Sequence, residues 1–377
     1  MKIWKRAIPF GLAAVLAAAG PAAVLAASPE FSKTEEEWAR LRDNVLEYDE
    51  IAELVHEYNT TVDANRADYA RTKRKTVEDV TEDYWKAAEQ YGNAIFYSSD
   101  DMSAATAKLN QRQAENAAAD NVNDGEIDRL TYAKAEAGIV KQAQQLMNTY
   151  HQQLLKRQLE ENNKNYQERL LNAAAAKQGA GTATSVDILN AQQSVYNSQA
   201  EIISLDAQIE DSRQNLALMT GWKQDGQPDI QGMPEIDFSR IDRMDPETDK
   251  ELAMQNDYTL AIEKRRLNNA SYTDTQKLYS TNVSKLEESI KSAVDLSYQN
   301  TLQARTAYEQ AQLSLTVANN NLNAGARKLQ VGMVSQLDYE DLVYKQQTAQ
   351  TTYQLKEMEL FQALENYDWL LAGLASS

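Results

Sequence analysis

The sequence of 377 residues has no cysteine and only two histidines. Without cysteine the chain forms no disulfide and has no thiol to carry a lipid. His56 and His151 lie far apart and have no carboxylates at metal-ligand spacing, which argues against a zinc site. No phosphate-binding loop, dinucleotide fingerprint or nucleophile elbow occurs. We therefore expect no enzymatic activity, no cofactor and no metal.

Proline is also scarce, and its positions divide the chain. No proline lies between residues 30 and 227, and none follows residue 246. Because proline interrupts helix interiors, two long proline-free blocks predict two helical halves joined by an irregular linker. We assign the first helical repeat to residues 28–221, the linker to 222–248 and the second repeat to 249–377.

Basic residues are outnumbered by acidic ones, and the formal net charge is −18. Binding of nucleic acid requires a basic surface that contacts phosphates, so we expect no nucleic-acid partner. A solvated acidic surface on an exported protein is the simpler interpretation of this charge.

Long apolar runs are missing after the first residues of the chain. Residues 1–27 have a basic start, an apolar run and small residues near Ala26 and Ala27, the layout of a secretory signal peptide. The alternative is an uncleaved membrane anchor, which Gly20 and Pro21 within the run make less favourable. No later stretch approaches the roughly 20 apolar residues that a membrane-spanning helix needs.

Apolar residues instead recur at helical spacing. An amphipathic pattern begins soon after the leader, with apolar residues seven apart at Leu41, Tyr48, Val55 and Val62. Residues 185–220 contain a longer series, formed by Ile188, Val195, Ile202, Ile209 and Leu216. A sustained seven-residue repeat indicates helices that pack side by side along a seam. Residues 126–178 and 285–330 each read as one long helix of roughly 70 Å. The predicted fold class is all-α, with long antiparallel coiled-coil-like helices in two tandem repeats.

Two glycines at equivalent places in the two halves indicate helical hairpins. Gly181, in "GAGTATSVDILN", is followed by Thr184 and Asp187, and Gly332, in "VGMVSQLDYEDL", is followed by Ser335 and Asp338. Glycine ends a helix in the left-handed conformation. Serine or threonine followed three residues later by an acid is a capping pattern for the next helix. We therefore expect tight turns at 179–185 and 331–336, with Thr184 and Ser335 as the hairpin caps.

This arrangement resembles the TolC-type outer-membrane efflux family. "QVGMVSQLDYEDLVYKQQ" looks like that family's second hairpin and "GAGTATSVDILNAQQSVYNSQ" like its first. The resemblance implies a homotrimer whose helices form a hollow α-barrel. It also implies an adaptor protein and an inner-membrane transporter as partners. The expected location is the outer membrane and periplasm of the cell envelope, or the outside of the cytoplasmic membrane in a cell without a conventional outer membrane.

The resemblance implies two kinds of site at the hairpins. Acidic residues would form a pore constriction from Asp338, Asp341 and Asp187, although Asn190 breaks the pattern in the first hairpin. Apolar-flanked glycines would dock the adaptor, and these tips are Val331, Gly332 and Met333 in the second hairpin and Ala180, Gly181 and Thr182 in the first. The first tip is the looser match.

The chain departs from the family where membrane-spanning strands are expected. Within residues 260–294, only the short polar stretch "TDTQKLYSTNVSK" separates two helical stretches, which leaves no room for spanning strands. Residues 92–125 read as helix and then turn. We predict an α-barrel protomer without clear β-barrel strands, so the resemblance does not extend to direct membrane insertion. Two functions remain open: an export conduit, or a structural or interaction protein of the envelope that uses the same hairpin scaffold without a channel.

Overall fold

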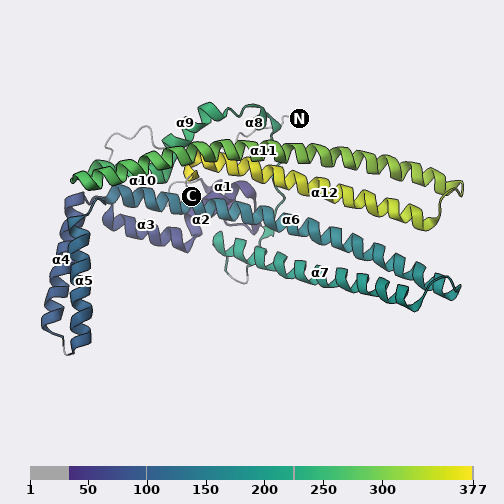
Figure 1. Ribbon diagram of the computed structural model, residues 1–377, viewed down its shortest axis with the longest axis horizontal. Coiled ribbons are helices and arrows are strands. Elements are labelled where there is room, and N and C mark those ends of the chain that lie inside the picture. The colour runs from purple at the N-terminus through teal and green to yellow at the C-terminus, as the bar shows by residue number, and fades with distance from the viewer. Residues whose placement is uncertain (1–33, 99, 224–225, 376–377) are drawn as a thin grey trace.

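The computed structural model describes residues 34–98, 100–223 and 226–375, so the predicted signal peptide lies outside the described residues. Its main feature is a layer of four long helices (Figure 1). They are α6 (Gly125–Gly179), α7 (Ser185–Met219), α11 (Thr273–Gln330) and α12 (Gln336–Trp369). Helices α6 and α7 form one antiparallel pair and α11 and α12 the other, and α12 packs on α6. The order across the layer is therefore α11, α12, α6, α7, with α7 and α11 at its two edges.

The predicted all-α class and the long helices are confirmed. Helix α6 has 55 residues and α11 has 58, and neither contains proline. The apolar series of residues 185–220 faces α6, since none of its members is exposed and Ile202 and Leu216 are buried. The prediction differs at the start of α11, which begins at Thr273 rather than near residue 285. The mostly polar stretch 273–285 contains no proline or glycine to interrupt a helix, and its Val283 packs against a core cluster that includes Leu260 and Ile290.

The N-terminal part is broken into short elements, although its apolar residues recur every seven positions. The elements are α1 (Glu35–Leu41), β1 (Val45–Leu46), a 3-10 turn η2 (Tyr48–Glu50), α2 (Ile51–Tyr58) and α3 (Thr60–Thr72). Leu41, Tyr48, Val55 and Val62 are nevertheless all buried in one cluster. The break has a tertiary cause, because β1 pairs in parallel with β2 (Asp229–Ile230), far away in the sequence.

The segment between α3 and α6 forms a helical hairpin that extends away from the layer (Figure 1). It consists of α4 (Val77–Phe96) and α5 (Asp101–Ala119). Its two helices pack on each other through small residues, with Ala88, Ala107 and Ala114 buried. The sequence prediction of helix and turn in residues 92–125 agrees with this arrangement.

The predicted linker 222–248 is only partly irregular. Helices α8 (Phe238–Asp242) and α9 (Pro246–Asn256) begin inside it, and α10 (Tyr258–Asn269) follows. The first two helices start for local reasons. Asp237 caps α8, Asp245 caps α9, and Pro246 occupies the first turn of α9. The last element of the described residues is a short π-helical turn, η3 (Leu370–Leu374).

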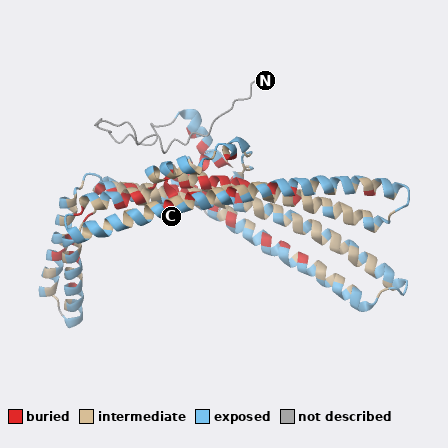
Figure 2. Ribbon diagram, turned by 45° about the horizontal axis from the view of Figure 1, so that its top comes forward, coloured by how far each residue is buried: buried red, intermediate tan, exposed pale blue. Residues whose placement is uncertain are grey.

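Buried residues concentrate away from the glycine hairpins (Figure 2). The largest cluster joins the N-terminal elements to α6, α7 and α12 and includes Leu46, Ile51, Met147, Leu216 and Phe361. Towards the hairpin tips the helices are mostly exposed or half-buried. The four helices are thus anchored at one end, while their other end is held mainly by contacts within each helix pair.

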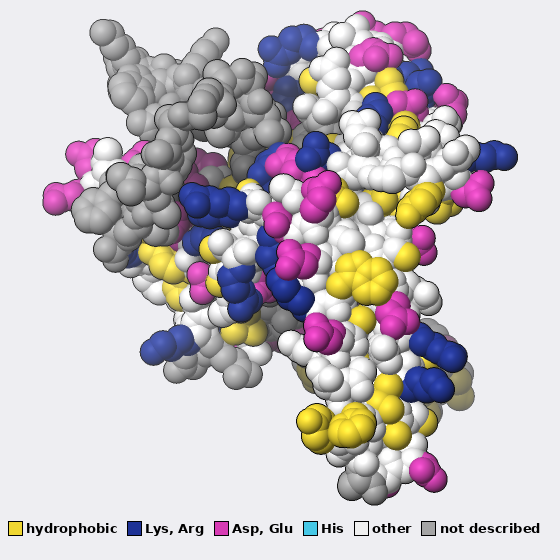
Figure 3. All heavy atoms as spheres, turned by 90° about the vertical axis from the view of Figure 1, so that its left-hand side faces the viewer, with side chains coloured by type: hydrophobic (Ala, Val, Ile, Leu, Met, Phe, Trp, Pro, Cys, Tyr) yellow, Lys and Arg dark blue, Asp and Glu magenta, His cyan; other side chains and the backbone are white. Residues whose placement is uncertain are grey.

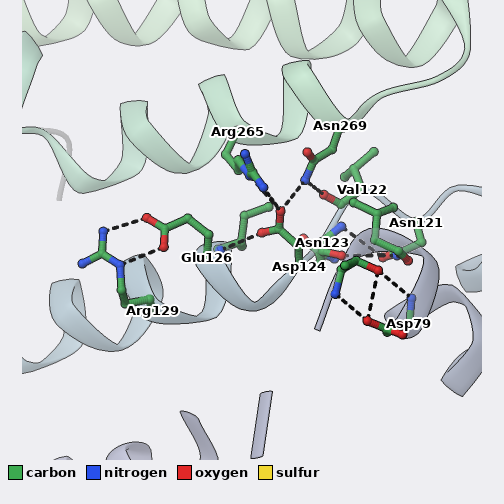
Figure 4. A network of polar contacts seen from close by, with 12 residues as sticks. Asp79, Asn121, Val122, Asn123, Asp124, Glu126, Arg129, Arg265 and Asn269 are labelled. Carbon is green, nitrogen blue, oxygen red and sulfur yellow. Dashed lines mark hydrogen bonds and ion pairs between the residues drawn. The ribbon is translucent and has the colours of Figure 1, made fainter. Parts of the chain in front are cut away.

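A polar network fastens the second repeat to the start of α6 (Figure 4). Buried Asp124 caps α6 by accepting a hydrogen bond of 3.0 Å from the amide of Ile127. It also accepts hydrogen bonds of 2.7 Å from Arg265 Nε and 3.0 Å from Asn269 Nδ2, both on α10. Burial alone would raise the pKa of Asp124, but these hydrogen bonds and the charge of Arg265 outweigh it and hold that pKa below its usual value.

This network predicts an acid-dependent contribution to stability. Because the pKa of Asp124 is lowered by folding, its stabilisation is present above the unfolded value of about 3.9 and is lost as pH falls through the folded pKa. We expect Asp124→Asn to reduce the free energy of unfolding at pH 7 by about 2 kcal/mol. The difference from wild type should shrink below about pH 4 in urea titrations. Asp101→Asn, at an exposed acid, is the control, and a difference that persists undiminished to about pH 2 would contradict the assignment.

Candidate functional site

The two glycine hairpins lie at the same end of the molecule, at the far ends of the α6–α7 and α11–α12 pairs (Figure 1). Residues 180–184 connect the first pair and residues 331–335 the second. Gly181 and Gly332 have φ values of 75° and 73°, in the left-handed region that favours glycine. In both turns the residue after glycine donates its amide to a helix carbonyl five residues back, at 2.8 Å. This is a Schellman motif, so the same backbone device ends both helices.

Each returning helix starts with the capping pattern expected from the sequence. Ser335 Oγ donates to Asp338 Oδ2 at 2.7 Å and accepts the Asp338 amide at 3.1 Å. Thr184 and Asp187 repeat the arrangement, with the Thr184 amide donating to Asp187 Oδ2 at 2.7 Å. The hydrogen bonds from the Ser335 hydroxyl and amide hold the pKa of Asp338 below its usual value, and those from the Thr184 amide and hydroxyl do the same to the pKa of Asp187.

Asp341 occupies a different environment from Asp338. Whereas Asp338 is exposed at the tip, Asp341 is half-buried one turn along α12. Tyr166 of α6 donates its hydroxyl to Asp341 Oδ1 at 3.1 Å, and Lys345 pairs with Asp341 Oδ2 at 2.6 Å. The Tyr166 ring stacks on Tyr344 with centroids 4.5 Å apart. Asp341 therefore belongs to a contact that joins the two helix pairs near their tips, which sequence spacing did not indicate.

The apolar tip residues are exposed to solvent. Val331 and Met333 flank Gly332 with exposed fractions of 68% and 73%. Ala180, Gly181 and Thr182 of the first hairpin are also exposed. The second tip thus presents two large apolar side chains on either side of a tight turn, and the first presents small and polar ones.

The edge helix α7 has apolar residues on two opposite faces. Ser198 faces α6, because its hydroxyl accepts a hydrogen bond of 3.1 Å from Asn163. Leu189, Tyr196 and Ile203 lie about 140° to 180° around the helix from Ser198. These three residues, here called the α7 edge stripe, have exposed fractions of 62%, 68% and 61%. Sequence reasoning missed this stripe, although its signal is present as a second seven-residue series one position after Ile188, Val195 and Ile202.

The opposite edge helix, α11, has a comparable face. Its inner side contacts α12, where Tyr308 and Tyr353 share a hydrogen bond of 2.8 Å between their hydroxyls. Leu313 follows Tyr308 by five residues, which places it about 140° around the helix. Leu313, Leu296 and Val317 form the α11 edge stripe and are exposed by 65%, 63% and 50%. Both edges of the four-helix layer therefore present apolar side chains that no described residue of the same chain covers.

The two histidines have structural contacts. His56 Nδ1 lies 2.6 Å from Glu136 Oε1, which ties α2 to α6, and His151 Nε2 lies 2.8 Å from the carbonyl oxygen of Gln231. Within the described residues no group of three or more histidine, cysteine, aspartate or glutamate side chains is arranged to hold a metal ion. No helix in the described part of the chain has the length and apolar content of a membrane span.

Comparisons with known proteins find similarity in structure only. No protein-family model matches the chain, and no curated protein matches it by sequence. The outer-membrane channel OprN is similar with a TM-score of 0.56 and 12% identity over 89% of this chain and 92% of OprN. A Pseudomonas aeruginosa membrane protein gives a TM-score of 0.55 and 11% identity over 86% of this chain and 90% of that one. The Campylobacter jejuni outer-membrane channel CmeC gives 0.50 and 10%, covering 90% and 88%. The resemblance expected from the hairpins is thus confirmed at the level of the fold.

Proposed function

We propose that this protein is a TolC-type conduit for export, in which three copies close their four-helix layers into a hollow α-helical tube in the cell envelope. The observation that carries the proposal is the pair of apolar edge stripes. A bundle that functions as a monomer buries one face of each helix, whereas a layer that closes into a ring needs an apolar face at each lateral edge. The α7 edge stripe of one copy then packs against the α11 edge stripe of the next.

The length of these edges suits such an assembly, since α7 has 35 residues and α11 has 58. In the ring, α7 of one copy lies beside α11 of the next copy for much of its length, as long helices do in coiled coils. Contacts of this kind between obligate subunits bury on the order of 2,000 Å² or more. The interface is heterologous, since the two edges differ, and a heterologous interface that closes gives a ring. The number of three copies follows from the resemblance to TolC-type channels.

In this ring the hairpin tips form the narrow end. Asp338, Asp341 and Asp187 of each copy then surround the opening and give it a cation-attracting acidic ring. The hydrogen bond from Tyr166 to Asp341 holds α12 against α6 beside this ring. Release of that contact lets one helix pair move relative to the other, which is a physical route to opening.

The exposed tip residues fit a partner that delivers cargo to the tube. Val331 and Met333 project beside the tight turn at Gly332 and can enter an apolar groove of an adaptor protein. The adaptor in turn connects to an energised transporter of the inner membrane. The proposal assigns no catalysis to this chain, because its site consists of caps, apolar tips and an acidic ring.

Electron microscopy and conductance together test the conduit. Purified protein should appear as hollow cylinders about 100 Å long, since a 58-residue helix spans roughly 90 Å. Compact monomers or solid rods would instead support an envelope protein without a channel. In lipid-reconstituted assemblies, changing both Asp338 and Asp341 to alanine should raise ion conductance by up to about a hundredfold, since three copies together lose hydrogen bonds worth about 3 kcal/mol and every 1.4 kcal/mol changes an equilibrium constant tenfold.

Two matched variants separate the causes of that change. Tyr166→Phe removes only the hydrogen bond to Asp341, so it should raise conductance while leaving the acidic ring and its block by divalent cations in place. Asp211→Ala, at an exposed acid of α7 away from the tips, should change neither property. Unchanged conductance and unchanged divalent-cation block in the double aspartate variant would remove the pore role of these residues.

A further inference from the structure

The hairpin of α4 and α5 ends in an apolar tip that neither the core nor the proposed tube explains. Phe96, Tyr97 and Met102 are exposed by 84%, 81% and 80%, the highest values among large hydrophobic side chains of the described residues. Phe96 and Tyr97 lie at the end of α4 and Met102 in the first turn of α5, so all three lie at the same end of the hairpin. Figure 3 shows hydrophobic side chains gathered at the lower end of this hairpin.

Hydrogen bonds close the hairpin at its base and join the start of α6 to the chain just before α4. Asn121 donates to the carbonyl oxygen of Val77 and to Thr81 Oγ1, both at 3.1 Å. The amide of Gly125 donates to the carbonyl oxygen of Lys75 at 2.9 Å. The tip lies at the far end of α4 and α5, and the whole hairpin is at the opposite end of the molecule from the glycine hairpins (Figure 1). The tip can therefore reach a surface that the glycine hairpins do not contact.

We propose that this tip inserts into the interface of a lipid bilayer with neutral or zwitterionic headgroups. The shape and size of the patch favour a membrane over a protein. Three such side chains expose on the order of 500 Å², less than the roughly 800 Å² per partner of a stable protein interface. They also stand at the projecting end of a helical hairpin, and a bilayer accepts a projecting apolar group without needing a complementary pocket. Aromatic side chains with a polar end, such as Tyr97, suit the headgroup region.

The charge around the tip selects the kind of lipid. Residues 91–106 contain Asp100 and Asp101 and no lysine or arginine. An anionic surface attracts basic segments, so it would not attract this tip. Asp100 caps α5 by accepting hydrogen bonds from the amide and hydroxyl of Ser103 at 2.8 and 2.7 Å, so its charge is compensated at the helix N-terminus. The tip therefore binds by apolar burial rather than by electrostatic attraction.

Binding to phosphatidylcholine vesicles tests the proposal with the full chain. The triple variant Phe96→Ser, Tyr97→Ser and Met102→Ser should reduce the fraction that co-sediments by about tenfold or more, because three exposed apolar side chains are lost. Added phosphatidylserine should weaken binding by the wild type, and high salt should leave it unchanged. Leu109→Ser, on the same hairpin and exposed by 57%, is the matched control and should bind as the wild type does.

A probe at the tip separates its insertion from any other membrane contact of the chain. Because the chain already has five tryptophans, quenching is compared with the wild type. Brominated lipids should quench a larger fraction of the fluorescence in Phe96→Trp than in the wild type, whereas Leu109→Trp should add little to the quenched fraction. The proposal is overturned if the triple variant binds vesicles as the wild type does. It is also overturned if brominated lipid quenches the tryptophan fluorescence of Phe96→Trp no more than that of the wild type. It is also overturned if the triple variant loses self-association in the absence of lipid, since a second copy of the chain would then cover the tip. These readouts concern lipid and are independent of whether hollow cylinders form.

Discussion

Glutamates at Leu189 and Ile203 are expected to weaken self-association about a thousandfold or more and to abolish hollow cylinders. Both residues belong to the α7 edge stripe and are exposed by 62% and 61% in the single chain. In the proposed ring each would be buried against the α11 edge of the next copy. Two unpaired carboxylates per interface cost several kcal/mol to bury, and every 1.4 kcal/mol changes an equilibrium constant tenfold. Mass photometry of the purified variants measures the loss directly.

The design of this variant isolates assembly from folding. Because Leu189 and Ile203 point away from α6, the monomer should keep its helical circular dichroism spectrum and its unfolding midpoint. Leu109→Glu is the control, since Leu109 has a similar exposed fraction of 57% but lies on the α4–α5 hairpin. A double variant that still assembles like the wild type would show that α7 is not an interface, and the conduit proposal would fail with it.

Gly221→Ala is expected to lower the free energy of unfolding by about 3 to 5 kcal/mol. The loss has two causes, because alanine is unfavourable in a left-handed conformation and its Cβ would overpack the site. Gly221 ends α7 with a φ of 93°. A Cβ at this position would overlap the Cβ of Tyr58 and lie 3.2 Å from the Tyr58 carbonyl oxygen. The neighbouring Asn59 donates to the carbonyl oxygen of Met219 at 2.9 Å, so the backbone of α2 has little freedom to move away.

Gly332 provides a matched comparison because its backbone is also left-handed, but no neighbouring atom crowds the position of a Cβ. Its φ is 73°, and a Cβ there would meet nothing within 4 Å. Gly332→Ala should therefore cost only about 1 to 2 kcal/mol, the price of the left-handed conformation. Urea unfolding of both variants measures the difference, and equal losses would contradict the structural explanation. Since Gly332→Ala should remain folded, any loss of adaptor binding in that variant would report on docking rather than on unfolding.

The conformations of the two hairpins could be predicted from short sequence stretches because their causes are local. A left-handed glycine followed by a capping box fixes a turn within a few residues, and neither device needs a distant partner. The face of α7 that packs on α6 could also be predicted, because apolar residues repeated every seven positions lie on one face of a helix and pack against a neighbouring helix. The absence of proline from the interiors of α6 and α11 similarly marked them as unbroken rods.

Other features depend on contacts between distant residues. The N-terminal apolar pattern predicted the buried residues but not the breaks between them, since those require strand pairing of Val45 and Leu46 with residues 229–230. The linker was read as irregular because glycine and proline cluster there, whereas Asp237 and Asp245 cap helices within it. The resemblance to TolC-type channels placed Asp341 with Asp338, whereas only the approach of α12 to α6 gives Asp341 its partner Tyr166.

The sequence by itself determined the helices, the two hairpins and their caps, since these follow from interactions within a few turns of one chain segment. Only the tertiary structure decided the order of the four helices, and with it which helices form the edges. The same apolar series around Leu189 would be core in a closed bundle and is surface here, because α6 packs on α12 and leaves α7 with one neighbour. Periodicity specifies that a face is apolar, but what covers that face is set by the packing of whole helices.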